Sequence, residues 1–250
     1  MIFLKTPEEI RILNKANMTL DTILNYIESH ICVGENTQTL DDIANNCSLK
    51  FNVTPSFKGY RGFPKALCVS INEEIVHGIP SSNRILQNGD VVSIDFGLNY
   101  KGFHADAART IIVGQTDKKI IDLVKNTRHA LMSGVEQMCI GNRLQDISKA
   151  IEKVAKEHKY GNIKKMCGHG IGRHLHEEPQ VLNYVDIKSP NIRLQEGLVL
   201  AIEPMFTLGT SDIKILNDGW TVATADKSIA CHWELSVAIV AGKPFILGKQ

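Results

Sequence analysis

Five residues of this sequence carry the side chains of a metal-binding or acid–base site, although they are far apart along the chain. Apolar runs that predict buried strands lead into two of the acids, and no Lys or Arg stands directly beside any of them. Burying an unpaired carboxylate costs free energy, so acids in such positions need a partner. The five residues are Asp95, Asp106, His169, Glu203 and Glu234.

Divalent metal ions would be a suitable partner for this set. Hard and borderline cations accept carboxylate oxygens and imidazole nitrogens. Two such ions about 3.5–4 Å apart need bridging carboxylates, and the pair can deprotonate a bridging water and polarise a substrate carbonyl. The alternative is that each acid is a surface or salt-bridged residue, which is the ordinary role of a single Asp or Glu.

The first two acids lie in a predicted β-hairpin that runs from Val91 to Gly114. The segment Asn99-Tyr100-Lys101-Gly102 has the composition of a turn. With the turn centred on its two middle residues, Asp95 would lie directly opposite Asp106, whereas a bulge at Gly102 would shift the register by one. Like charges on opposed residues repel each other, so this arrangement also predicts a shared cation.

Helices and further strands must position the remaining candidates. Thr6 has the features of an N-cap, with Pro7 at the first helical position and Glu9 completing a capping box. A second helix is predicted to start at Thr39 and to end near Phe51. Two more helices are predicted, from about Asp117 towards Met138 and from about Leu144 to His158, and strands at Ala66–Ile71, Leu198–Pro204, Trp220–Ala225 and Cys231–Val240.

The order of these elements repeats weakly between the two halves of the chain. In each half, helices precede a His-Gly-Ile segment, VHGIP or GHGIG, and acids on strands follow it. Two αβ halves related by a pseudo-two-fold axis would bring all four carboxylates near that axis. The repeat alone leaves chance open as an explanation.

Length and composition limit the class of protein. A chain of 250 residues forms one large domain or two small ones, and a net charge of +1 implies no polyanionic partner. No signal peptide and no apolar run of membrane-spanning length is visible. The six cysteines are dispersed without a CxxC motif, which predicts reduced thiols and a cytoplasmic location.

Three long motifs make the resemblance to a known family specific: GYRGFPKALCVSINEEIVHGIP, CGHGIGRHLHEEPQV and VLAIEPMF. Together with the five candidate ligands, they resemble the type I methionine aminopeptidases of metallopeptidase family M24, in the short bacterial form, over essentially the whole chain. The resemblance implies an α+β "pita-bread" (creatinase/aminopeptidase) fold with antiparallel sheet around a dinuclear metal site. Residues 1–250 would form a single catalytic domain, with pseudo-halves of about 1–115 and 116–250.

The resemblance also implies a role for each candidate ligand. Asp95 would bind one divalent ion, His169 and Glu203 would bind the other, and Asp106 and Glu234 would bridge the two. The identity of the ions stays open between Co, Mn, Fe and Zn, all of which accept oxygen and nitrogen ligands.

Histidines and a glutamate would assist the reaction by the same resemblance. His77 would hydrogen-bond the scissile amide region, His176 would hydrogen-bond the substrate carbonyl oxygen or the developing oxyanion, and Glu203 would also shuttle protons. His174 is interpreted as a rim or surface residue. The other histidines are interpreted as solvated or structural: His30, His104, His129, His158 and His232.

An apolar pocket for a methionine side chain is the last implied part of the site. Its predicted lining is Tyr60, Phe63, Cys68, Leu175 and Trp220. The alternative is that these are ordinary core residues. The sequence departs from the common family pattern at four positions, which puts the rim of the pocket and inhibitor selectivity in doubt: Phe57, Arg61, Leu175 and Leu235.

The implied function is removal of the initiator methionine from nascent chains whose second residue is small, by attack of a metal-bridged hydroxide on the Met carbonyl. Nascent peptides with N-terminal Met would be the substrates, the ribosome near its exit tunnel is a candidate partner, and the chain would be a monomer without nucleic-acid or membrane partners. One rival is an Xaa-Pro aminopeptidase or prolidase on the same fold. The other is a non-catalytic binding protein on that fold.

Overall fold

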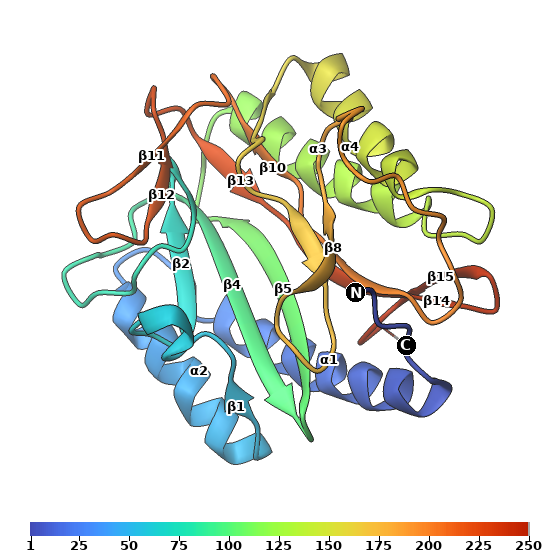
Figure 1. Cartoon of the computed structure of the whole chain (residues 1–250). Helices are drawn as coiled ribbons and strands as arrows, with labels where there is room; N and C mark the ends of the chain where they lie inside the picture. Colours follow the sequence, from blue (N-terminus) through green and yellow to red (C-terminus); the bar gives the residue numbers. More distant parts are fainter. Residues whose placement is uncertain (250) are drawn as a thin grey trace.

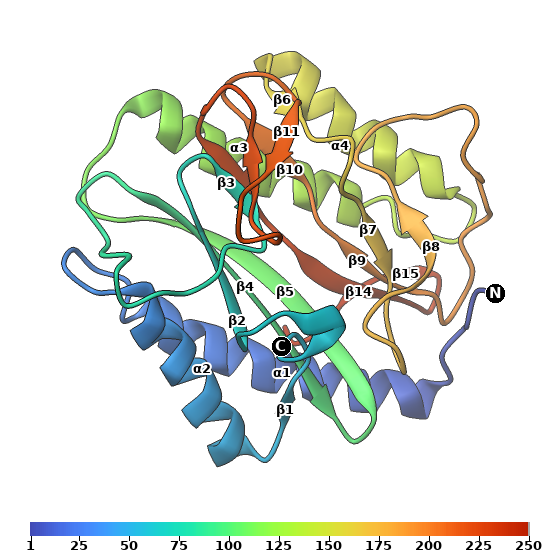
Figure 2. The ribbon, with the colours of Figure 1, turned by 60° about the vertical axis from the view of Figure 1, so that its left-hand side comes forward.

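The computed structural model describes residues 1–249, in which two pairs of helices each lie along an antiparallel sheet (Figure 1). The helices of the first pair are α1 (Pro7–Glu28) and α2 (Thr37–Phe51). Those of the second pair are α3 (Lys118–Val135) and α4 (Leu144–His158). Figure 2 shows the blue pair along the strands β4 (Val91–Tyr100) and β5 (Phe103–Ile112), and the green-to-yellow pair along the sheet that holds β9 (Val199–Ile202) and β14 (Leu235–Val240).

The start of the first helix confirms the predicted cap, whereas the start of the second differs from the prediction. The Thr6 hydroxyl accepts a hydrogen bond from the Glu9 backbone, and the Glu9 carboxylate accepts one from Thr6 in return. At α2 the N-cap is Asn36, whose side-chain oxygen accepts from the Thr39 backbone N–H. The helix therefore begins two residues before Thr39, because Asn is a strong cap and satisfies that N–H from outside.

The first sheet carries the predicted hairpin and has its own apolar core. Its strands follow the order β1-β4-β2, with β5 on β4: β1 (Thr54–Pro55), β2 (Leu67–Ile71), β4 (Val91–Tyr100) and β5 (Phe103–Ile112). The buried faces of α1 and α2 pack on these strands, with residues from Ala16 to Val113 in one cluster. A short 3-10 helix, Tyr60–Gly62, follows β1.

The second sheet has five strands and a separate core made by residues from Leu123 to Ile239. Two three-stranded sheets, β13-β10-β6 and β11-β12-β3, complete the fold. The five strands, in spatial order, are β15 (Lys243–Ile246), β14 (Leu235–Val240), β9 (Val199–Ile202), β7 (Gly168–Gly170) and β8 (Glu177–Val181). The strands of the small sheets are β3 (Glu74–Val76), β6 (Gly161–Asn162), β10 (Met205–Thr207), β11 (Ile213–Ile215), β12 (Val222–Thr224) and β13 (Ala230–His232).

The register of the hairpin differs from the predicted one. Tyr100 pairs with Phe103, so the turn has two central residues, and both have positive φ: Lys101 at 52° and Gly102 at 82°. Two positive φ angles are typical of the tight turn that matches strand twist. Asp106 consequently lies opposite Gly97 rather than Asp95, and the two acids are diagonal neighbours on one face.

The predicted last strand is also interrupted. The chain forms β13 up to His232 and resumes as β14 at Leu235, so Trp233 and Glu234 lie between two strands of different sheets. At this break the backbones of Ala108 and Glu234 exchange hydrogen bonds of 3.4 and 3.0 Å. Ser236 and His232 flank that pair and bond to Asp106 and Thr110, respectively.

This contact between residues 106–110 and residues 232–236, called the junction below, joins the two sheets. It sets an acid from the first half beside an acid from the second half. Among the residues that the structure describes, no helix is long and apolar enough to cross a membrane.

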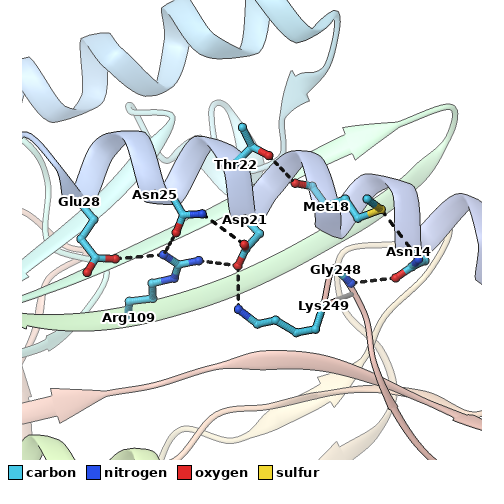
Figure 3. A network of polar contacts seen from close by, with 9 residues as sticks. All are labelled: Asn14, Met18, Asp21, Thr22, Asn25, Glu28, Arg109, Gly248 and Lys249. Carbon is cyan, nitrogen blue, oxygen red and sulfur yellow. Dashed lines mark hydrogen bonds and ion pairs between the residues drawn. The ribbon is translucent and has the colours of Figure 1, made fainter.

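A polar network holds α1 against β5 on the outer side of the first sheet (Figure 3). Arg109 on β5 donates to Asp21, Asn25 and Glu28 on α1 at 2.6, 2.7 and 3.0 Å. Lys249 also reaches Asp21, at 2.9 Å. The Arg109 side chain is only 14% exposed, so its charge is largely withdrawn from water and its bonds are worth more than those of an open surface pair.

We predict that Arg109→Ala lowers the free energy of unfolding by about 1–3 kcal/mol, because three partners on α1 lose a partly buried charged donor. The matched control is Arg11→Ala, which removes an exposed Arg from its pair with Glu8 and should cost less than about 0.5 kcal/mol. Urea denaturation of the two variants measures both effects. Equal destabilisation by the two substitutions would contradict the role given to Arg109.

Candidate active site

A cavity of about 260 Å³ lies between the two halves and collects every residue that the sequence singled out for the site. Both sheets, the small sheets and the Tyr60 segment contribute to its wall. The sequence-predicted residues in the wall are Tyr60, Phe63, Cys68, His77, Asp95, Asp106, His169, Leu175, His176, Glu203, Trp220 and Glu234.

Glycines beside the two His-Gly-Ile histidines allow the backbone packing that places them. Gly78, after His77, packs on the Val69 carbonyl, and a Cβ there would lie 2.2 Å from that oxygen. Gly168, before His169, packs equally closely on the Ala201 carbonyl, at 2.3 Å. Any side chain at these two positions would separate the strands, so the glycines are required by the local structure.

Three of the predicted ligands converge closely. Asp106, His169 and Glu234 are buried, and one ligand atom from each lies within 4.8 Å of the others. His169 Nδ1 is 2.9 Å from the Gly170 carbonyl oxygen, so Nδ1 carries the proton and Nε2 is left free as a ligand. Nε2 lies 3.7 Å from Glu203 Oε1.

The acids of the cavity have no cationic partner from Lys or Arg among residues 1–249. Asp95 Oδ1, Asp106 Oδ1 and Glu234 Oε1 are buried and accept no hydrogen bond within the described chain. Native proteins rarely leave such atoms unsatisfied. The oxygen-rich donor set with one imidazole fits divalent metal ions, which would satisfy these atoms.

Burial and mutual repulsion make the carboxylates weak acids in the metal-free chain. Burial raises the pKa of Asp95 to about 7 and that of Glu203 to about 7. The pKa values of Asp106 and Glu234 are raised well above the usual range by burial first and by neighbouring carboxylates second. The ionised form is therefore unfavourable here unless a cation accompanies it.

The two predicted catalytic histidines are neutral near pH 7. Burial lowers the pKa of His77 to about 4. Burial and the adjacent His169 lower the pKa of His176 to about 3. His176 Nδ1 lies 2.8 Å from the Tyr60 hydroxyl, and when that hydroxyl donates, the imidazole proton stays on Nε2.

A buried ion pair supports the segment that carries His176. Lys5 Nζ lies 2.5 Å from Glu177 Oε2, and both side chains are less than 5% exposed. The other oxygen of Glu177 accepts from the His174 backbone N–H. The N-terminal segment thus fixes the residue next to His176, while His174 itself is exposed, as predicted.

Aromatic and soft side chains form the apolar part of the wall. Phe63 and Trp220 meet edge to face with ring centroids 5.2 Å apart, and His77 lies 6.3 Å from the Trp220 ring. Cys68 is buried beside them and lines the same cavity. This lining suits a thioether side chain.

Two of the departures from the family pattern meet in one cluster. Phe57 and Leu175 both line the cavity and pack together with Tyr60. The Phe57 ring lies so close to Gly97 that a Cβ there would be 2.7 Å from it. Arg61 also lines the cavity, whereas Leu235 packs against the core of the second half.

His232 was interpreted as solvated or structural, and of these two alternatives the solvated one was wrong. His232 is 2% exposed, lines the cavity, and has Nε2 3.5 Å from Glu203 Oε2. Its position two residues before Glu234 was a signal for this, because alternate residues of a strand face the same side. Further wall residues that the sequence reasoning missed are Val76, Met166, Cys167 and Met205.

The model of metallopeptidase family M24 matches residues 11–241, and the chain therefore belongs to this family. It is 42% identical to the methionine aminopeptidase of Clostridium acetobutylicum, over 99% of this chain and 98% of that protein. The crystal structure of methionine aminopeptidase from Thermotoga maritima superposes with a TM-score of 0.97 at 38% identity, with all of both chains covered. The α+β pita-bread fold implied by the resemblance is confirmed.

Prolidase from Pyrococcus furiosus is a more distant structural neighbour, with a TM-score of 0.79 and 24% identity. The match covers 99% of this chain but 65% of the prolidase. At this identity the likeness concerns the fold alone.

We predict that removing the charge of Asp95 stabilises the metal-free protein more at pH 7.5 than at pH 5. Between an unfolded-state pKa near 4 and a folded-state pKa of about 7, the folded protein holds a proton on Asp95 that the unfolded chain has lost. Wild-type stability from this group therefore falls as pH rises through that window, whereas Asn at this position cannot ionise.

The measurement is the difference in free energy of unfolding between Asp95→Asn and wild type, in chelator, across that pH range. The matched control is Asp186→Asn, because hydrogen bonds from Lys188 and Ser189 lower the pKa of half-buried Asp186 instead of raising it. A difference that stays constant with pH for Asp95→Asn would show that Asp95 is not a buried acid awaiting a cation.

Proposed function

We propose that this chain is a metal-dependent exopeptidase that removes N-terminal methionine from nascent proteins when the second residue is small. The observation that carries the proposal is the single cavity in which buried, unpaired acids lie beside an apolar wall suited to a thioether. Membership of metallopeptidase family M24 and full-length similarity to methionine aminopeptidases support it.

The five candidate ligands would hold two divalent ions, of Co, Mn, Fe or Zn. Asp95 would ligate one ion, and His169 and Glu203 would ligate the other. Asp106 and Glu234 would bridge the two ions. The close approach of Asp106, His169 and Glu234 supports this assignment. When bound, such ions supply Lewis acidity toward a carbonyl and lower the pKa of water.

The remaining polar residues would orient the substrate and move protons. Neutral His176, with its Nε2 proton fixed by Tyr60, would donate to the carbonyl oxygen as negative charge develops there. His77, also neutral, would hydrogen-bond the scissile amide. Glu203, with its pKa near 7, would accept a proton and return it to the leaving amine.

Specificity would follow from the shape of the wall. Phe63, Cys68 and Trp220 would contact the methionine side chain, and Tyr60 with Leu175 would close the pocket near His176. A bulky second residue would have to pass these walls beside the metal ligands, which favours small residues there.

The cellular setting is part of the proposal. All six cysteines are free thiols, which supports a cytoplasmic location. Residues 1–250 would act as one catalytic domain and as a monomer, with two pseudo-halves that meet near residue 115, and the separate apolar cores support this division. Nascent chains are the proposed partners, with the ribosome near its exit tunnel as the place of encounter.

We predict that the enzyme cleaves Met-Ala-Ser and Met-Pro but not Ala-Ala-Ser or Phe-Pro, because the wall fits a thioether. Chelation should abolish cleavage and added Mn²⁺ or Co²⁺ should restore it, since the acids need a cation. The control is His169→Ala, which should lose activity without loss of fold. Cleavage of the Phe-Pro peptide instead would favour the prolidase rival, and undiminished cleavage by His169→Ala would refute the site as assigned.

A further inference from the structure

His232 is a histidine of the cavity wall that the proposed reaction leaves without a role. Its side chain is 2% exposed, and neither ring nitrogen has a hydrogen-bond partner within residues 1–249. A buried imidazole without partners loses its hydration and gains nothing in exchange. The cost to the fold is smaller if a bound group or a shifted neighbouring side chain supplies the missing hydrogen bonds.

The backbone of His232 is held firmly by the junction. Its N–H donates to Thr110 Oγ1 at 3.1 Å, and the same hydroxyl donates to its carbonyl oxygen at 2.7 Å. On its other side His232 pairs with Met205 on β10. The backbone that carries the imidazole is therefore held in place, as is needed for a side chain that orients a neighbouring residue.

That neighbour is Glu203, which lies between two imidazoles. His169 Nε2 is 3.7 Å from Oε1, and His232 Nε2 is 3.5 Å from Oε2. The second distance is about 0.5 Å longer than an ordinary N–H···O hydrogen bond. His232 and Glu203 are thus neighbours in the wall of the same cavity.

We propose that His232 is a positioning residue of the metal centre. Its Nε2–H donates to Glu203 Oε2, which leaves Oε1 on the side of His169 as the oxygen that would ligate a metal ion. The inference rests on the proposed function, because it takes Glu203 as a ligand. Hydrogen bonds to ligating side chains orient them, and their loss typically weakens metal affinity or activity by about 10–100-fold.

The test is calorimetric titration of the metal-free full-length chain with Mn²⁺, which needs no turnover. His232→Leu keeps an apolar side chain without a donor and should weaken Mn²⁺ binding about 10–100-fold. His232→Gln keeps an N–H donor of similar reach and should bind within a few-fold of wild type. His232→Asn carries the same amide on a shorter chain and should behave like Leu.

Two controls separate this role from mere loss of structure. His104→Leu alters a histidine on β5 that bonds Ser56 outside the cavity, and it should leave Mn²⁺ affinity unchanged. Melting of each metal-free variant reports its fold, and the Gln-to-Asn contrast remains informative if the Leu variant does not fold. X-ray absorption of the Mn²⁺-loaded wild type should show the imidazole of His169 alone.

The outcomes distinguish the two levels of inference. If the wild type binds no Mn²⁺, or binds it no more tightly than Asp106→Asn does, the proposed metal centre itself is overturned. If the wild type binds Mn²⁺ and Asp106→Asn binds it more weakly, but His232→Leu and His232→Asn bind it as tightly as the wild type, only the role of His232 is overturned. Two imidazoles in the wild-type absorption spectrum that fall to one in His232→Gln would make His232 a ligand and would also overturn its positioning role.

Discussion

The constraint on which this structure depends is the burial of four carboxylates, which repel one another when ionised, in the wall of one cavity. Their burial raises the pKa values of all four, and no Lys or Arg of the described chain neutralises them. Ionisation of all four together at neutral pH is therefore unfavourable unless positive charge enters the cavity. The site is therefore built as a receptor for cations, at the expense of the stability of the metal-free fold.

The fold meets this constraint by taking the acids from separate elements and clamping those elements together. Each of the two larger apolar cores belongs to one half, with residues from Ala16 to Val113 in one and from Leu123 to Ile239 in the other, and two smaller apolar clusters contain residues of both halves. The junction between residues 106–110 and residues 232–236 connects them with backbone hydrogen bonds. Asp106 and Glu234 belong to this junction, so one of the contacts that join the halves also forms part of the site.

Much of this arrangement was predictable from local patterns. The capping box at Thr6, the extent of α4 and every predicted wall residue from Tyr60 to Glu234 agree with the structure. The acids were recognisable because each follows or occupies an apolar strand without a neighbouring cation. The long motifs then supplied a family in which such acids hold metal.

What could not be predicted depended on register and on contacts between distant segments. The hairpin register depended on whether Lys101 adopts positive φ, which its residue type does not reveal. The break at Trp233 and Glu234 arises because β13 and β14 pair with different sheets, a tertiary effect invisible in an alternating sequence. The position of His232 in the cavity wall was missed for the same reason, since only the fold brings it to Glu203.

The most direct test of the central claim is anomalous diffraction from crystals of this protein soaked in excess Mn²⁺. The account predicts two anomalous peaks in the cavity, about 3.5–4 Å apart, between the carboxylates of the first half and those of the second. One peak or none in the cavity, with Mn²⁺ only on exposed acids, would contradict it.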